Sequence, residues 1–561
     1  MSSLKEQLDK IKSQIQKKDI DVTPPCIKIQ NIKTNGQKNS KEIYKSSNQK
    51  KRRKRKEKNK THDLLGLNTH RNNRGYSDDH LAKVYGDRKN GNQQKKPTLP
   101  KRQALPESSF ILAETSTPIT DNSYPHDWVN EGKYLQSKES GIGRILPIKI
   151  GIDFGTAYTK CALRITDKIF FVSWDGLCYN KNNYLLSGEL SIFSNGETKI
   201  GNFTGSHKKL NNIKLPFISS KNITSDDLGH ATIYLAWIMK YARAWLYKNH
   251  SLVIANRKLV WEVNIGTPTS AASSAIIQNA YEKVGYSAWH LSQKTEITIE
   301  NARKSLLTKH LLEEIQLDGL NQIPEFLAQI MGYVKSPQRQ DGLHLLVDVG
   351  AGTIDIAMFN IFNYRANNKD EGEDRFPIFA NAVKPLGTHF FMKERFDSLQ
   401  HDIDSINNME NIPSAKELAK TLSVETSTIE KIDIKFRKKY LTPTIIDVIT
   451  HTKTKRDPRS NGWNKGVKTL LSGGGSLCNV YQEATKLAFD KTPVIKINLP
   501  LPENIEGNIK PNDFHRLSVA YGLTYDKDDI GKILPPNEIE DFSNTSQENR
   551  HKPDRDEIYA K

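Results

Sequence analysis

Two segments of this sequence each place an Asp, a Gly and a Thr directly after a run of apolar residues. The first spans Ile148–Thr159, and the second, Leu343–Asp355, begins 195 residues further along the chain. In each segment the apolar run is typical of a buried strand, and the Gly and Thr are typical of a tight turn. Such a turn can direct backbone N–H groups and a hydroxyl at phosphate oxygens. The pair therefore predicts two halves of one phosphate site and a nucleotide ligand.

The positive charge of the chain is concentrated near its start. Residues 1–110 hold 28 Lys and Arg against 11 Asp and Glu, whereas the whole chain has a formal net charge of +19. Because this part is polar and lacks a long apolar run, we expect a basic, largely disordered tail over residues 21–140. Its run Lys50–Lys60 contains nine cations and could bind nucleic-acid phosphates without sequence preference. Nuclear import, contact with an anionic membrane and simple solubilisation are alternatives for the same run.

The first 20 residues carry a separate pattern. Leu4, Leu8, Ile11 and Ile15 repeat at spacings of four, three and four residues, which predicts one apolar face of a short amphipathic helix. A helix of this length is marginal in isolation, so we expect a protein partner to cover Leu4–Ile15.

The rest of the chain has the composition of a folded α/β protein. Apolar strand-like runs alternate with helical segments from about Leu146 to about Tyr525, and a polar C-terminal tail is expected over residues 526–561. The four cysteines lack metal-ligand spacing, and no apolar stretch reaches the ~20 residues of a membrane span. We therefore expect a cytoplasmic protein without a transmembrane segment, or a nuclear one in a eukaryote.

Further segments accompany the two Asp turns in a fixed order. Ile323–Ala328 lies between the turns, and Gly387–Thr388, Gly473–Ser476 and Phe514–Leu523 follow the second one. Together with the turns they resemble the nucleotide-binding unit of the actin, sugar kinase and heat-shock chaperone superfamily, and the spacing is most similar to DnaK-type chaperones. The resemblance implies a bilobal actin-like ATPase fold of two ribonuclease-H-like domains around a nucleotide cleft. Lobe I would span residues 145–342 and lobe II residues 343–525.

The resemblance also implies roles for the first turn. Asp153 would lie near the water shell of Mg²⁺, and the phosphates of ATP or ADP would contact Gly155, Thr156, Ala157 and Tyr158. Ala157 stands where the chaperones usually have a second Thr, which suggests slower hydrolysis.

In the second turn, the resemblance assigns Asp348 and Asp355 to hydrated Mg²⁺, and it counts Asp348 and Thr353 among the catalytic residues. The γ-phosphate would be approached by the backbone of Gly350, Ala351 and Gly352. Ala351 replaces a Gly, so its Cβ is tolerated only at a negative φ.

The remaining assignments lie outside the two turns. Lys214, in the segment Asn212–Leu215, would reach the γ-phosphate and offset its developing charge, whereas an ordinary solvated Lys is the alternative. Glu325 would place the metal or the attacking water; alternatively it only complements the positive end of a helix dipole. The adenosine would contact Gly473, Gly474, Gly475 and Ser476. Gly387 and Thr388 would form a second loop beside the nucleotide.

These features predict a slow ATPase that acts as a nucleotide-gated switch for a protein or nucleic-acid partner. Because only 36 residues follow Tyr525, we expect no counterpart of the peptide-binding domain of DnaK-type chaperones. Three alternatives stay open: nucleotide binding without turnover, an actin-like polymer-forming ATPase of the plasmid-segregation or cytoskeletal kind, and a small-molecule kinase.

Overall fold

The computed structural model describes Val129, Gly132 and residues 143–177, 182–218, 223–268, 274–308, 317–364, 372–401 and 412–542. The predicted helix at Leu4–Ile15 and the basic run Lys50–Lys60 lie outside the described residues, as does residue 543 onward. All residues predicted for the nucleotide site lie within them.

The first sheet contains the first Asp turn. Its strands are ordered β15-β3-β2-β1-β8-β9, and β4 pairs with β2 off this path. β1 is antiparallel to β2 and parallel to β8; β2 is antiparallel to β3, and β8 is parallel to β9. The bounds are β1 Arg144–Asp153, β2 Tyr158–Ile165, β3 Lys168–Phe171, β4 Leu186–Ser187, β8 Arg257–Thr267, β9 Gly319–Pro324 and β15 Ile505–Glu506.

The second sheet repeats this arrangement. Its order is β14-β13-β10-β11-β12-β16, so that β12-β11-β10-β13-β14 corresponds to β3-β2-β1-β8-β9. The directions also correspond, because β10 is antiparallel to β11 and parallel to β13, β11 is antiparallel to β12, and β13 is parallel to β14. The bounds are β10 Gly342–Val349, β11 Ile354–Tyr364, β12 Glu373–Lys384, β13 Val467–Ser472, β14 Val494–Ile497 and β16 Lys532–Leu534.

These two sheets, a small third one and the helices between them confirm the mixed α/β class expected from the sequence. The third sheet is formed by β5 Leu190–Ile192, β6 Thr198–Ile200 and β7 Lys208–Leu210. β1 and β10 are mostly buried, because both faces of each strand are covered by other parts of the protein, which explains their largely apolar sequences.

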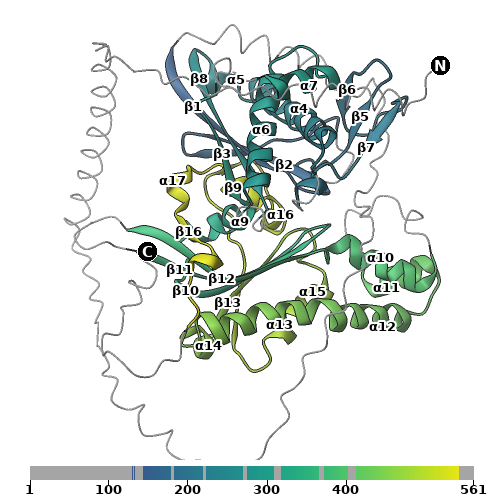
Figure 1. Ribbon diagram of the computed structural model, residues 1–561, viewed down its shortest axis with the longest axis vertical. Coiled ribbons are helices and arrows are strands. Elements are labelled where there is room, and N and C mark those ends of the chain that lie inside the picture. Colours follow the sequence, from purple (N-terminus) through teal and green to yellow (C-terminus); the bar gives the residue numbers. More distant parts are fainter. Residues whose placement is uncertain are drawn as a thin grey trace, which may run out of the picture. The chain divides into compact units, whose positions relative to one another are not determined.

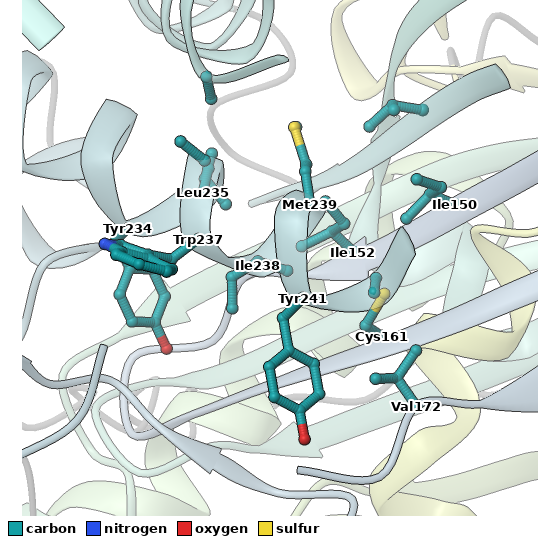
Figure 2. Close-up of a cluster of buried hydrophobic side chains, with 14 of the residues drawn as sticks. Ile150, Ile152, Cys161, Val172, Tyr234, Leu235, Trp237, Ile238, Met239 and Tyr241 are labelled. Atoms are coloured by element: carbon teal, nitrogen blue, oxygen red, sulfur yellow. The ribbon is translucent and has the colours of Figure 1, made fainter. Parts of the chain in front are cut away.

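The longest helix of the described residues, α4 (Ser225–Asn249), covers the first sheet. A capping box between Thr224 and Asp227 fixes its start. Figure 2 shows Leu235, Ile238 and Met239 of this helix among Ile150 and Ile152 of β1. Almost every residue from Ala231 to Tyr247 is buried, because α6 (Ala275–Ser292) packs on it as well.

Two helices connect the cores of the two sheets. α9 (Glu325–Val334) and α16 (Pro511–Gly522) pack on each other so closely that a Cβ on Gly522 would overlap the carbonyl oxygen of Ala328. Their apolar side chains share one core with Phe171 of the first sheet and Phe359 of the second.

The other helices are α5 Ser251–Ile254, α7 Ile299–Leu307, α10 Thr388–Leu399, α11 Ala415–Leu422, α12 Thr426–Phe436, α13 Thr442–His451, α14 Gly462–Lys465, α15 Asn479–Ala488, α17 Lys527–Ile530, the 3-10 turns η3 Leu215–Phe217 and η8 Pro536–Glu538, and the π-helical turns η6 Arg437–Leu441 and η7 Thr452–Arg456.

The lobe boundaries expected from the sequence need two corrections. Ile505–Glu506 pairs with β3, and α16 packs on β1 and β2, so the chain returns to the first sheet before residue 525. The polar C-terminal tail does not begin at residue 526, because β16 pairs with β12 and buries Leu534, while Ile530 is buried in α17. None of the helices in the described ranges is long and apolar enough to cross a membrane.

Candidate functional site

The first Asp turn lies at the end of β1. Asp153 is the last residue of that strand and is 5% exposed, and the backbone N–H of Gly155 donates to its carbonyl oxygen at 3.0 Å. A Cβ on Gly155 would overlap the carbonyl oxygen of Tyr158, so the turn requires glycine there. The backbone N–H of Gly188 donates to the carbonyl oxygen of Ala157 at 2.9 Å and secures the far side of the turn.

Asp153 forms an ion pair that was not predicted from the sequence. Lys160 lies directly opposite Asp153 in the β1–β2 ladder, and its Nζ is 2.9 Å from Asp153 Oδ2. Both side chains are largely buried, with 16% and 7% of their surface exposed. Lys160 therefore adds a cation to the site. Its sequence signal is weak, since one Lys in a strand that follows a turn is common.

The second Asp turn lies at the end of β10. Asp348 of β10 pairs with Asp355 of β11 in the antiparallel ladder, which brings the two carboxylates together. The turn between them is closed by the backbone N–H of Gly350, which donates to the carbonyl oxygen of Thr353 at 2.9 Å. Ala351 does not have a positive φ, so its Cβ is accommodated.

The two predicted glycine loops converge on this second turn. The backbone N–H groups of Thr388 and His389 donate to the carbonyl oxygens of Gly350 and Ala351, each at 3.0 Å, and that of Gly475 donates to Val349 at 2.9 Å. The approach is too close for side chains at three positions. A Cβ would overlap the carbonyl oxygen of Ala351 if placed on Gly387, Asp348 Oδ1 if placed on Gly473, and the Thr388 side chain if placed on Gly475.

Lys214 and Glu325 meet in a buried ion pair. Lys214 immediately precedes η3, and Glu325 is the first residue of α9, directly after β9. The Nζ of Lys214 contacts Oε1 of Glu325, and the two side chains are only 6% and 15% exposed. The alternative that Lys214 is an ordinary solvated Lys therefore does not hold.

The pKa shifts indicate that these charges form one group. Burial raises the pKa of Glu325, Lys214 opposes this shift, and the charge of Asp153 adds to it. Burial also raises the pKa of Asp348, where a hydrogen bond from Gln329 acts in the opposite direction and Asp153 again adds to the rise. The pKa of Asp355 is raised well above its usual value by burial, by Asp348 and by Glu325. The carboxylates of both turns therefore lie within electrostatic range of one another.

A cation would compensate these carboxylates. Asp348 Oδ1 and Asp355 Oδ1 are buried and have no hydrogen-bond partner within the described part of the chain. They line a small cavity of about 10 Å³ together with Gln329 and Asn381, enough for about one water molecule. Across the described ranges, no group of three or more His, Cys, Asp or Glu is placed to hold a metal ion. The unpartnered carboxylate oxygens are the type of ligand that Mg²⁺ prefers, but the cavity itself holds about one water molecule and not a hydrated ion.

Two more residues at the site were missed in the sequence. Tyr281 of α6 is 1% exposed, its ring lies 5.4 Å from that of Phe217, and its hydroxyl has no hydrogen-bond partner among the residues described. Burial raises its pKa, which the charge of Lys214 lowers and that of Glu325 raises, so it lies near this ion pair. Arg516 of α16 lies 5.6 Å from the centre of the Tyr158 ring and packs against Gly474, which links the first turn to the glycine loop.

Comparisons with known proteins add no further identification. Neither a scan against models of protein families nor a search of curated proteins finds a match for this chain.

Proposed function

We propose that the protein binds ATP with Mg²⁺ and hydrolyses it slowly, as a DnaK-like ATPase with an actin-like fold of two ribonuclease-H-like lobes. The observation that carries this proposal is the meeting of Asp153, Lys214, Glu325, Asp348 and Asp355 in one charged group. The repeated strand order of the two sheets supports the fold assignment. Each Asp turn follows the first strand of its repeat, which gives the two turns equivalent places.

In this proposal the two turns bind the phosphates from opposite sides. The turn of Gly155–Tyr158 and the turn of Gly350–Thr353 direct backbone groups toward them. The Gly473–Ser476 loop binds the adenosine, and the Gly387–Thr388 loop is a second contact with the nucleotide. When bound, Mg²⁺ would neutralise phosphate charge from a position held through water by Asp153, Asp348 and Asp355.

Lys214 and Glu325 are the proposed catalytic pair. Lys214 supplies positive charge for the terminal phosphate, where charge develops during transfer. Glu325 fixes the direction of the Lys214 ammonium through their ion pair, and its carboxylate is available to orient the attacking water. Lys160 provides a second cation beside the first turn.

The proposed output is a change in affinity for a partner between the ATP and ADP states. The two turns come from different sheets, so loss of the terminal phosphate removes a ligand that both contact. The partner would be a protein at Leu4–Ile15 or a nucleic acid at Lys50–Lys60.

Phosphate release from ATP by the full chain, with and without Mg²⁺, tests the proposal. We expect Mg²⁺-dependent release above the spontaneous rate. Asp348→Asn should lower it at least about ten-fold, because a charge essential to the site is lost. Asp397→Asn, an exposed residue of α10, is the matched control and should change release less than two-fold. If ATP raises the melting temperature but is not hydrolysed, the protein is a nucleotide sensor; if it does neither, the proposal is wrong.

A further inference from the structure

One segment of the folded part of the chain is strongly basic. Between Lys431 and Lys468 there are eleven Lys and Arg and only three Asp and Glu. By contrast, residues 111–561 as a whole carry a net charge of only +2, because the first 110 residues account for +17 of the total of +19. The positive charge of the folded part is therefore concentrated in this segment.

The segment forms a long helical rod on the second sheet. α12, η6, α13 and η7 follow one another without a break from Thr426 to Arg456, and Figure 1 shows α12 and α13 as one extended helix. Phe436, Leu441 and Ile445 lie on its buried side in the core of the second sheet, where α13 packs on β11, β12 and α15. The apolar side of the rod is thus already covered by the protein itself.

Two clusters of cations are exposed, one on the rod and one at and just beyond its C-terminal end. Lys431, Lys435, Lys438 and Lys439 are exposed and have the spacing of one helix face around η6. A second exposed group surrounds η7 and α14 and consists of Lys453, Lys455, Arg459 and Lys465. We call these eight residues the basic helix face.

The charge of this face is only weakly compensated by neighbouring acids. Asp433 is engaged by Arg395, whose two guanidinium nitrogens donate to its carboxylate at 2.7 Å each. In the described part of the chain, Lys431, Lys438, Lys455 and Lys465 form no ion pair. Lys435 pairs with Glu394 at 3.2 Å, but an exposed pair of this kind contributes little.

Aromatic rings hold several of the cations in place. Lys439 lies 4.6 Å from the ring centre of Tyr440, Lys453 lies 5.4 Å from that of Trp463, and the Arg459 guanidinium lies 4.9 Å from that of Phe542. Such contacts restrict these side chains before a ligand arrives, so less side-chain entropy is lost when a ligand binds.

We propose that the basic helix face binds the phosphate backbone of double-stranded nucleic acid. Lys438 and Lys453 are separated by about 22 Å at 1.5 Å per helical residue. A DNA duplex carries one negative charge per ~1.7 Å of its axis, so both clusters can reach phosphates of one duplex. Lys-rich contacts to phosphates carry no base information, so binding is independent of sequence. A membrane surface fits less well, because a helix that lies in a membrane interface needs an exposed apolar face. Among the described residues of this rod, Ile434, which is 40% exposed, is the only large apolar side chain that is exposed.

Fluorescence anisotropy of a labelled 30-base-pair DNA, without nucleotide, tests the proposal on the full chain. The test variant carries Lys431→Gln, Lys435→Gln, Lys438→Gln and Lys439→Gln. The matched control removes four exposed Lys charges elsewhere, with Lys258→Gln, Lys283→Gln, Lys416→Gln and Lys420→Gln. Gln is a comparable helix former, and Lys258 is an exposed residue near the start of β8, so both variants should melt within a few degrees of the wild type. A third variant replaces the cations of Lys50–Lys60 by Gln.

We expect the test variant to lose at least about ten-fold in affinity near 100 mM salt. The slope of the logarithm of the association constant against the logarithm of salt concentration is negative, and its magnitude should decrease by about 3 to 4. Each of the four lost phosphate contacts contributes about 0.9 to it. The control should lose less than about two-fold. Equal losses in test variant and control would mean a general charge effect and overturn the proposal. It is also overturned if only the Lys50–Lys60 variant loses binding, or if the test variant loses binding to anionic phosphatidylserine vesicles but not to DNA. None of these outcomes depends on ATP hydrolysis.

Discussion

Asp348 and Asp355 face each other across the β10–β11 ladder, and each has a buried Oδ1 that lacks a hydrogen-bond partner within the described residues. The charge of Asp348 adds to burial in raising the pKa of Asp355, because two nearby carboxylates repel each other. A protein that keeps both is less stable than it could be, which is typical of a site kept for binding.

Replacing Asp355 by Asn should stabilise the protein in the absence of Mg²⁺. The pKa of Asp355 is higher in the folded protein than in the unfolded chain, where it is near 3.8. The stability that Asp355 contributes is therefore complete at a pH below 3.8 and is lost as the pH rises through the folded-state pKa. Asp355→Asn removes this loss and should raise the free energy of unfolding at pH 7 by about 1 kcal/mol or more. Urea unfolding from pH 5 to 8 measures it, and the variant should show the flatter pH dependence. A less stable variant would contradict the expected repulsion.

The Lys214–Glu325 pair can be dissected by a double-mutant cycle. Lys214→Met leaves the Glu325 carboxylate buried without its cation, which should cost about 3–5 kcal/mol of unfolding free energy. Glu325→Gln should cost less, and the double variant should recover most of the loss because neither charge then remains buried. Phosphate release should be abolished in both single variants and should not return in the double variant. Recovery of release together with stability would show that the pair is only structural.

Two adjacent glycines give a sharp test of the nucleotide loop. Gly473 has a φ of +82° and a Cβ on it would overlap Asp348 Oδ1, whereas the nearest atom to a Cβ on Gly474 is 3.8 Å away. Gly473→Ala should therefore displace Asp348 and reduce the ATP-induced rise in melting temperature by more than half. Gly474→Ala should leave this rise nearly unchanged. Equal behaviour of the two variants in a thermal shift assay would argue against the assigned loop.

The crossing of α9 and α16 predicts a strong stability effect outside the charged group. Gly522→Ala would force its Cβ onto the carbonyl oxygen of Ala328 and should destabilise the protein by about 3 kcal/mol or more. Gly229 of α4 has no atom within 4 Å of an added Cβ, so Gly229→Ala should instead stabilise by about 0.5–1 kcal/mol. Chemical denaturation of both variants measures the difference. A mild effect of Gly522→Ala would mean that the two helices can separate easily.

The two strand–turn units were predictable because their signals are local. In Ile148–Thr159 and Leu343–Asp355 the apolar run, the Asp and the glycines are neighbours in the chain, and the first turn depends on Gly155, where a side chain would clash. The glycine loop at Gly473–Gly475 was predictable for the same reason.

The contacts around these turns could not be predicted in this way. Lys160 meets Asp153 only through the register of β1 and β2, and Gln329 reaches Asp348 only because α9 and β10 line the same cavity. Tyr281 and Arg516 belong to helices whose sequences show only an ordinary apolar face. The return of Ile505–Glu506 to β3 joins residues more than 300 positions apart, and a local pattern carries no such information.

The α/β class, the two Asp turns and the basic run Lys50–Lys60 can be read from the chain alone, since these depend on neighbouring residues. The folded arrangement was needed to show that five charged residues from separate elements share one buried group and that Lys214 is paired rather than solvated. The physical reason is that charge interactions and burial depend on distance in space, which the strand register and the α9–α16 crossing set.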